Sequence, residues 1–299
     1  MKKTVLILVA LLLVLNLMAC SKDAPAIDTS NEKKISEKAI QENELKMNEP
    51  IEEIFDFEPY FNSIKGCTVI LDVETNTYYT YNMSMVEKQE SPCSTFKIIS
   101  TLLGLKYGII DNKNSTMGYD GYEYSISEWN TDVTLENAFR TSCIWYFKNV
   151  INQVGQESVK RELEDLQYGN CDVSEWNGSD VNPSDSLNGF WLESSLKISP
   201  INQVQVIADI FEGNAGYKEV DVSLLKEIML IKEMENEGVK VYGKTGTRTV
   251  GTAWLVGFAE KNNKKFYYAI YVDDSPEKIS GNKVKEIGFE ILKDFLKDT

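Results

Sequence analysis

The sequence predicts an α+β fold, in which an antiparallel sheet is flanked by terminal helices and carries an inserted helical subdomain. Strand-like segments come in two pairs, 67–73 with 77–81 and 253–259 with 266–273, and a short polar turn separates the members of each pair. Between the pairs, the segment from about Ser94 to Leu230 has mostly helical patterning. A last amphipathic helix is predicted from the spacing of Val284, Ile287, Ile291 and Phe295.

The N-terminus has the pattern of an export signal. Lys2 and Lys3 precede an almost wholly apolar run, 4–15, which is too short to cross a bilayer with margin, and Leu17-Met18-Ala19 then leads to Cys20. We expect residues 1–20 to be a lipoprotein signal peptide and Cys20 to be lipidated, although ordinary cleavage beside an incidental cysteine fits the same pattern. Residues 21–49 are polar and lack aromatic residues, which predicts a tether, and 50–299 predict the folded domain. The expected location is the outer face of the cell membrane, reached through a lipid anchor.

Composition excludes several functional classes. The formal net charge of −15 disfavours binding to nucleic acid. The chain has no histidine, which excludes Ser-His-Asp triads, Cys-His dyads and histidine zinc sites. Its cysteines show no CxxC spacing, so we expect no metal site and favour buried free thiols, with pairing left open for Cys67, Cys93, Cys143 and Cys171. Oligomeric state has no signal in the sequence.

A serine and a lysine at helical spacing are the strongest catalytic candidates. Ser94 and Lys97 stand at i and i+3 in Ser-Pro-Cys-Ser-Thr-Phe-Lys, which predicts a helix start with both side chains on one face. Unpaired N–H groups of such a first turn can stabilise an oxyanion. A surface helix with a capping serine is the ordinary alternative for this motif on its own.

Two further segments carry polar groups suited to acyl transfer. Lys244-Thr245-Gly246 lies in or at the end of a strand, where a charge and a hydroxyl can bind a carboxylate and the glycine permits close approach of a ligand. Ser142 would place a hydroxyl near the nucleophile, where it can relay a proton. Each segment alone also fits an ordinary strand end or a polar helix position.

Taken in order, these motifs resemble the penicillin-recognising serine enzymes, and in detail the class D β-lactamases. The resemblance runs from about Gly66 to the C-terminus and implies that 50–299 is a catalytic domain of the β-lactamase/transpeptidase type. It rests on Ser94-x-x-Lys97, Ser142-Cys143-Ile144, Tyr168-Gly169-Asn170, Trp129-Asn130-x-Asp132, Phe190-Trp191-Leu192-Glu193, Leu196-Lys197-Ile198-Ser199 and Tyr242-Gly243-Lys244-Thr245-Gly246.

The resemblance implies hydrolysis of β-lactams through an acyl-enzyme on Ser94. Lys97 would be the general base, carboxylated on Nζ by carbon dioxide or bicarbonate, since an apolar site favours its neutral amine. Phe96, Ile144 and Trp191 would surround it, and the Trp191 indole would hold the carbamate. No other cofactor is implied.

The remaining roles also follow from the resemblance. Ser142 and Lys244 would carry a proton to the leaving nitrogen, and the N–H groups of Ser94 and Thr247 would form the oxyanion hole. Thr245, Gly246 and Thr247 would line the substrate site. The class commonly places an arginine before the last helix to bind the substrate carboxylate, and this chain has none there. Its candidate cations are Lys283, Lys285 and Arg248.

Two rival functions share these motifs. A β-lactam-sensing receptor would be acylated without turnover, and only deacylation separates it from a hydrolase. A cell-wall transpeptidase would carry Asn where this chain has Ile144.

Overall fold

A computed structural model describes residues 51–53, 55–180, 182–234, 238–248, 251–273 and 280–297. These residues belong to one compact unit, Pro50–Thr299. The predicted signal peptide, the lipidation site Cys20 and the tether at 21–49 lie outside the described residues and stay predictions. Within the described ranges, no helix combines the length and apolarity needed to cross a membrane.

The centre of the unit is a six-stranded sheet with the order β1-β3-β2-β6-β5-β4. Strands β2 to β6 pair with one another in antiparallel fashion, and the short edge strand β1 pairs with β3 in parallel. The predicted strand pairs are confirmed, and the Lys244-Thr245-Gly246 segment forms the other edge strand. The bounds are β1 Ile51–Glu53, β2 Gly66–Asp72, β3 Thr77–Tyr81, β4 Val239–Thr247, β5 Thr252–Lys261 and β6 Lys264–Asp273.

The β5–β6 hairpin owes its tight turn to two asparagines. Asn262 and Asn263 both have left-handed backbone, with φ of 52° and 65°. Asparagine tolerates this conformation, and a two-residue turn of this kind matches the right-handed twist of the strands it joins. The turn therefore fixes the register of the two long central strands.

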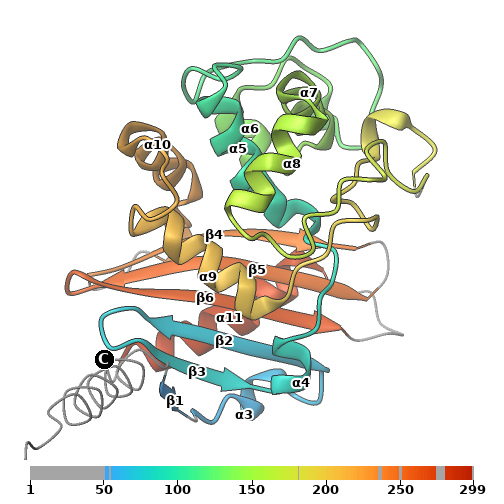
Figure 1. The fold of residues 1–299 in the computed structure, drawn as a ribbon. Coiled ribbons are helices and arrows are strands. Elements are labelled where there is room, and N and C mark those ends of the chain that lie inside the picture. The colour runs from blue at the N-terminus through green and yellow to red at the C-terminus, as the bar shows by residue number, and fades with distance from the viewer. Residues whose placement is uncertain are drawn as a thin grey trace, which may run out of the picture. The chain divides into compact units, whose positions relative to one another are not determined.

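Different helices cover the two faces of the sheet (Figure 1). On one face, α11 (Gly281–Phe295) and the single-turn α3 (Glu58–Phe61) pack on apolar side chains of β5 and β6. On the other face, α9 (Pro200–Phe211) crosses the strands, and the helical subdomain lies beyond it. The predicted α+β class is confirmed, with a terminal helix of only four residues on the N-terminal side.

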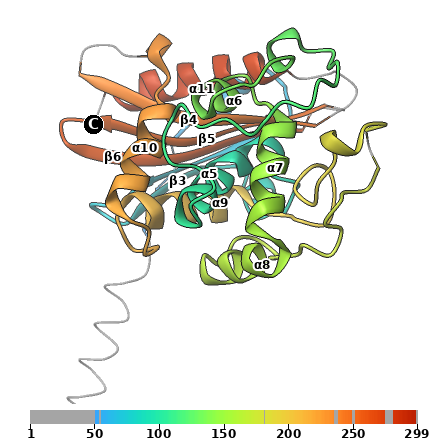
Figure 2. The same cartoon turned by 90° about the horizontal axis from the view of Figure 1, so that it is seen from above.

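The helical subdomain is built around α5 (Lys97–Lys106), which is buried along all but its last residue. Figure 2 shows α5 between α7 and α10, over the sheet. The segment was predicted to be mostly helical, but long irregular stretches separate its helices. The remaining elements are α4 Met83–Val86, η1 Cys93–Phe96, η2 Ser127–Trp129, α6 Leu135–Arg140, α7 Ile144–Val154, α8 Gln156–Asp165, η3 Asp185–Leu187, α10 Glu219–Met229 and η4 Lys232–Met234.

Candidate active site

Ser94 lies in a short 3-10 turn, η1, and not in the α-helix that the sequence predicted. The α-helix α5 begins only at Lys97. In a 3-10 turn residues i and i+3 eclipse each other, so the predicted juxtaposition survives the change of helix type. Lys97 Nζ donates a hydrogen bond of 2.9 Å to Ser94 Oγ.

Polar side chains hold the nucleophile turn in place from inside the protein. Thr95 Oγ1 donates to the carbonyl of Pro92 at 2.7 Å, and Gln203 Nε2 on α9 donates to Thr95 Oγ1 at 2.9 Å. Cys93 has a left-handed φ of 50°, which is costly for a residue with a Cβ. Its N–H donates to the carbonyl of Trp191 at 3.0 Å, so a distant loop helps to fix this conformation.

Lys97 is fully buried, and burial lowers its pKa to about 8. Its ammonium group lies 5.5 Å from the centre of the Phe147 ring. Cys143 and Cys93 are titratable neighbours of Lys97, and burial raises the pKa of each thiol to about 11. At neutral pH both are uncharged, and no carboxylate among the described side chains pairs with Lys97. The site therefore favours a neutral amine to an unusual degree for a lysine.

Ser142 lies between two helices, whereas the ordinary alternative for this segment would place it on one. It joins α6 to α7 in left-handed backbone with φ of 57°. Two contacts fix this corner: the Trp129 indole donates to the carbonyl of Thr141 at 3.1 Å, and Cys143 N–H donates to the carbonyl of Ala138. The corner turns the Ser142 hydroxyl toward β4.

Lys244 approaches Ser142 from β4. Its Nζ donates to Ser142 Oγ at 2.5 Å and to the carbonyl of Thr245 at 3.1 Å. Burial holds the pKa of Lys244 well below its ordinary value, and the charges of Lys97 and Lys285 add to that effect. The structure thus brings together two serine–lysine pairs, Ser94–Lys97 and Ser142–Lys244.

Gly246 explains how β4 can lie against the nucleophile turn. A Cβ at this position would be 2.8 Å from the carbonyl oxygen of Pro92 and 3.2 Å from the Thr95 nitrogen. We expected the glycine to admit a ligand, and the neighbour that the structure shows is the turn itself. The next residue, Thr247, ends the strand. The N–H groups of Ser94 and Thr247 therefore belong to two segments in contact.

The environment of Trp191 bears on the predicted support of Lys97. Trp191 is 1% exposed, and its ring packs against Phe96 with centroids 5.7 Å apart. Its indole Nε1 is buried and has no hydrogen-bond partner among the described residues. Ile144, half-buried, begins α7. Sequence reasoning missed Phe147, although it lies one turn after Ile144 on the same helix.

The three candidate cations have different surroundings. Arg248 is paired with Glu90 and Glu193, at 3.2 and 3.4 Å. Lys283 is exposed and pairs with Glu286 on its own helix. Lys285 makes no ion pair within the described part of the chain, and it lines a hollow together with Lys244 and Thr245. Only Lys285 thus combines a free charge with a place beside the β4 residues.

Two other motifs serve the loops around the site. Asn170 Nδ2 donates to the carbonyl of Ser195, and Asn170 Oδ1 accepts from Lys197 N–H. Gly169 has no room for a side chain, because a Cβ would lie 1.9 Å from the Lys197 carbonyl oxygen. This pairing fastens the segment that follows Trp191.

The four described cysteines are free thiols, and Cys171 is the one that is partly exposed. In the described ranges, no group of three or more His, Cys, Asp or Glu side chains is arranged to hold a metal ion.

Fold and site together define a serine acyl-transfer enzyme in which lysines take the place of histidine. The penicillin binding protein transpeptidase domain family matches residues 66–293. A probable β-lactamase, YbxI of Bacillus subtilis, is 30% identical over 237 residues, which cover 79% of this chain and 82% of that protein. The chain belongs to the penicillin-binding protein transpeptidase family, in the branch that contains the class D β-lactamases.

Two solved structures are similar to the chain over most of its length. A class D β-lactamase from Bacillus subtilis has a TM-score of 0.71 and 30% identity, and the match covers 81% of this chain and 95% of that one. The C-terminal domain of the Bacillus licheniformis BlaR penicillin-receptor has a TM-score of 0.73 and 28% identity, covering 82% and 97%. The branch therefore includes a receptor domain as well as enzymes.

The contact at Gly246 leads to a test of the site. Gly246→Ala should slow acylation of Ser94 by a fluorescent penicillin at least about tenfold, because the added methyl must push β4 from the nucleophile turn. Gly281→Ala is the matched control, since its Cβ would meet Thr245 at an ordinary 3.6 Å. Equal labelling rates for the two variants would show that the close packing is not required.

Proposed function

We propose that the protein hydrolyses β-lactams through an acyl-enzyme on Ser94. The observation that carries the proposal is the hydrogen bond between Ser94 Oγ and a buried lysine whose pKa is lowered to about 8. A neutral Lys97 can accept the hydroxyl proton as Ser94 attacks the lactam carbonyl. Similarity to a probable β-lactamase and to a class D β-lactamase structure supports the substrate class.

The second serine–lysine pair is suited to the leaving group. When the lactam C–N bond breaks, its nitrogen needs a proton. Ser142 Oγ can give its proton and regain one from Lys244 Nζ, with which it is hydrogen-bonded. The N–H groups of Ser94 and Thr247 would stabilise the oxyanion from the two packed segments.

Carboxylation of Lys97 fits the residues present. A neutral, buried amine is the form that reacts with carbon dioxide, and Trp191 Nε1–H is a buried donor without an acceptor among the residues that the structure describes. A carbamate would supply an anionic oxygen base for acylation and for activation of water in deacylation. Trp191 would donate to it, and Phe96, Phe147 and Ile144 would exclude water from the pocket.

Lys285 is our candidate for the substrate carboxylate. It lies beside Lys244 and Thr245 without an ion pair of its own among the described residues, whereas two carboxylates engage Arg248. An ammonium group offers a point charge and not the two-pronged geometry of arginine. Thr245 can add a hydroxyl donor.

A receptor that is acylated without turnover is the second candidate function. The similarity to a BlaR penicillin-receptor domain favours it, since this domain matches the chain as well as the enzymes do. Deacylation alone separates the two functions.

For location, we propose a lipid anchor at Cys20 on the outer face of the cell membrane, supported by the N-terminal sequence pattern alone.

Turnover of a penicillin by the purified protein tests the function. We expect product to accumulate linearly well past one equivalent of enzyme, because a general base is available for deacylation. Ser94→Ala should abolish both hydrolysis and covalent labelling. A burst that stops at one equivalent would indicate the receptor function, and labelling that survives in Ser94→Ala would place the nucleophile elsewhere.

Carboxylation of Lys97 predicts a dependence on pH and bicarbonate. The neutral amine is lost as pH falls below its pKa of about 8, and carbamate formation releases a proton, so acid favours decarboxylation. After incubation at about pH 5 without carbon dioxide, activity assayed at neutral pH should be low and should recover when bicarbonate is added. Lys97→Ala should stay inactive with bicarbonate. Recovery that is independent of bicarbonate would argue against the carbamate.

A penicillin and its methyl ester together test Lys285. Lys285→Ala should lower kcat/KM for the penicillin about tenfold, the usual scale for a charged hydrogen bond, and should change kcat/KM for the ester less than about twofold. Lys293→Ala, in the last turn of the same helix, controls for the loss of one positive charge. An equal loss for both substrates would exclude Lys285 as the carboxylate anchor.

A further inference from the structure

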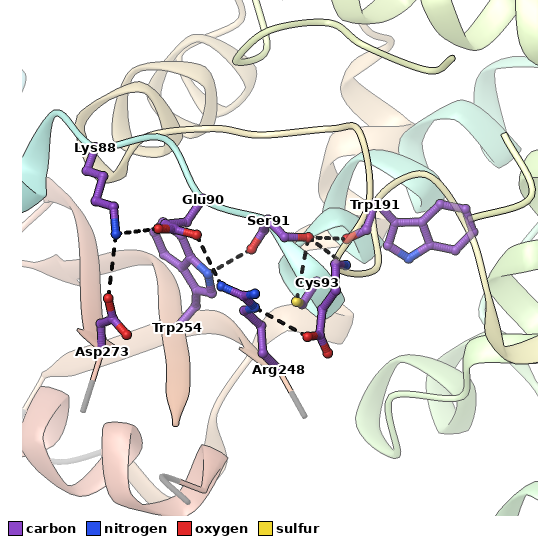
Figure 3. Close-up of polar contacts among 9 residues, drawn as sticks. Lys88, Glu90, Ser91, Cys93, Trp191, Arg248, Trp254 and Asp273 are labelled. Atoms are coloured by element: carbon purple, nitrogen blue, oxygen red, sulfur yellow. Dashed lines mark hydrogen bonds and ion pairs between the residues drawn. The ribbon is translucent and has the colours of Figure 1, made fainter. Parts of the chain in front are cut away.

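The loop that carries Trp191 is tied to the segment before the nucleophile by its main chain (Figure 3). Ser91 Oγ donates to the carbonyl of Trp191 at 3.0 Å and accepts from Glu193 N–H at 2.9 Å. Cys93 N–H donates to the same carbonyl at 3.0 Å. One buried hydroxyl therefore bridges the residues on either side of Leu192.

The side chain of Glu193 extends this tie to β4. Glu193 Oε2 accepts from Arg248 Nε at 3.4 Å, and Arg248 Nη1 reaches Glu90 Oε2 at 3.2 Å. Arg248 is the residue after Thr247, the last residue of β4. One guanidinium thus links the nucleophile segment, the Trp191 loop and the end of the Lys244 strand.

The pairing of Arg248 with Glu90 and Glu193 also supplies the positive charge that these two carboxylates need. Both carboxylates are mostly buried, with side chains 12% exposed for Glu90 and 18% for Glu193, and Arg248 lies between them. Burial without a counter-charge would be costly for either carboxylate. Glu193 also has left-handed backbone, with φ of 54°, which requires support from its surroundings. Lys88 continues the chain of charges outward, to Glu90 and Asp273.

Figure 3 shows the indole of Trp191 pointing away from these charges, while its main chain faces Ser91 and Cys93. The charges can therefore act on the indole only through the position of the loop. The strength of a hydrogen bond changes when its donor moves by a few tenths of an ångström. A shift of this loop therefore changes which acceptors Trp191 Nε1 can reach.

We propose that Arg248 and Glu193 are positioning residues that fix the Trp191 loop and so set how completely Lys97 is carboxylated. The inference rests on the proposed carbamate. It assigns Arg248 a role other than carboxylate binding. It also couples the end of β4, where substrate would lie, to the support of the general base.

The experiment measures carbamate directly on the full protein. Titration with ¹³C-bicarbonate, followed by the carbamate signal in ¹³C NMR, gives the half-saturating concentration without any substrate. Glu193→Gln keeps the shape and the backbone contact with Ser91, but it loses the charge. Arg248→Lys keeps a charge but loses the two-armed contact. In both variants the half-saturating bicarbonate concentration should rise on the order of fivefold, the scale expected for loss of one such ion pair.

The matched control is Lys88→Gln. Lys88 belongs to the same chain of charges and pairs with Glu90 and Asp273, but among the described residues it makes no ion pair with the Trp191 loop. Its half-saturating bicarbonate concentration should stay within about twofold of wild type. The bicarbonate dependence of penicillin turnover should shift in parallel with the NMR titration in the two test variants.

The outcomes are distinct. One outcome is a clear carbamate signal in the wild-type protein, with the same half-saturating bicarbonate concentration in Glu193→Gln and Arg248→Lys as in wild type. That result would overturn the positioning role and leave the proposed general base intact. Absence of a carbamate signal in the wild-type protein would overturn both the positioning role and the proposed carbamate. This result would be known before any variant is compared. An equal shift in Lys88→Gln would show a general charge effect and would also overturn the positioning role.

Discussion

The chemistry of this site depends on a lysine that the fold keeps out of water. Lys97 begins the central helix of the helical subdomain, and its side chain is covered on all sides by that subdomain and the sheet. Its neighbours include an aromatic ring and two protonated thiols, and among the described residues no carboxylate pairs with its ammonium group. A protein without histidine can obtain a base at neutral pH in this way, because desolvation changes the proton affinity of an ordinary amine.

The sheet contributes by position more than by chemistry. The nucleophile turn lies against one face of β4, and Gly246 removes the side chain that would keep them apart. Lys244, on the same strand, donates to Ser142, which lies at the corner that Trp129 holds in place. Elements distant in sequence thus converge at the seam between sheet and helical subdomain.

Local sequence signals predicted the parts of this arrangement that are local in space. The paired strand-like segments, the Asn262-Asn263 turn and the i, i+3 spacing of Ser94 and Lys97 are short-range patterns, and the structure confirms them. The helix type predicted at Ser94 was wrong, and the corner at Ser142 was not predicted, because both depend on contacts with remote residues. The partners of Arg248 lie 158 and 55 residues away along the chain, so no local pattern could reveal that its charge is engaged.

The backbone at Cys93, next to the nucleophile, and at Ser142 places a constraint on how the sequence can change. Cys93 and Ser142 both hold left-handed conformations that glycine would adopt freely, yet each carries a side chain. Strain of this kind, on the order of 1 kcal/mol or more per residue, must be offset by the rest of the domain. Substitutions that relax it would raise thermal stability while loosening the geometry of the two hydroxyls. Selection for activity and selection for stability therefore pull in opposite directions at these positions, and gains in one should be accompanied by losses in the other.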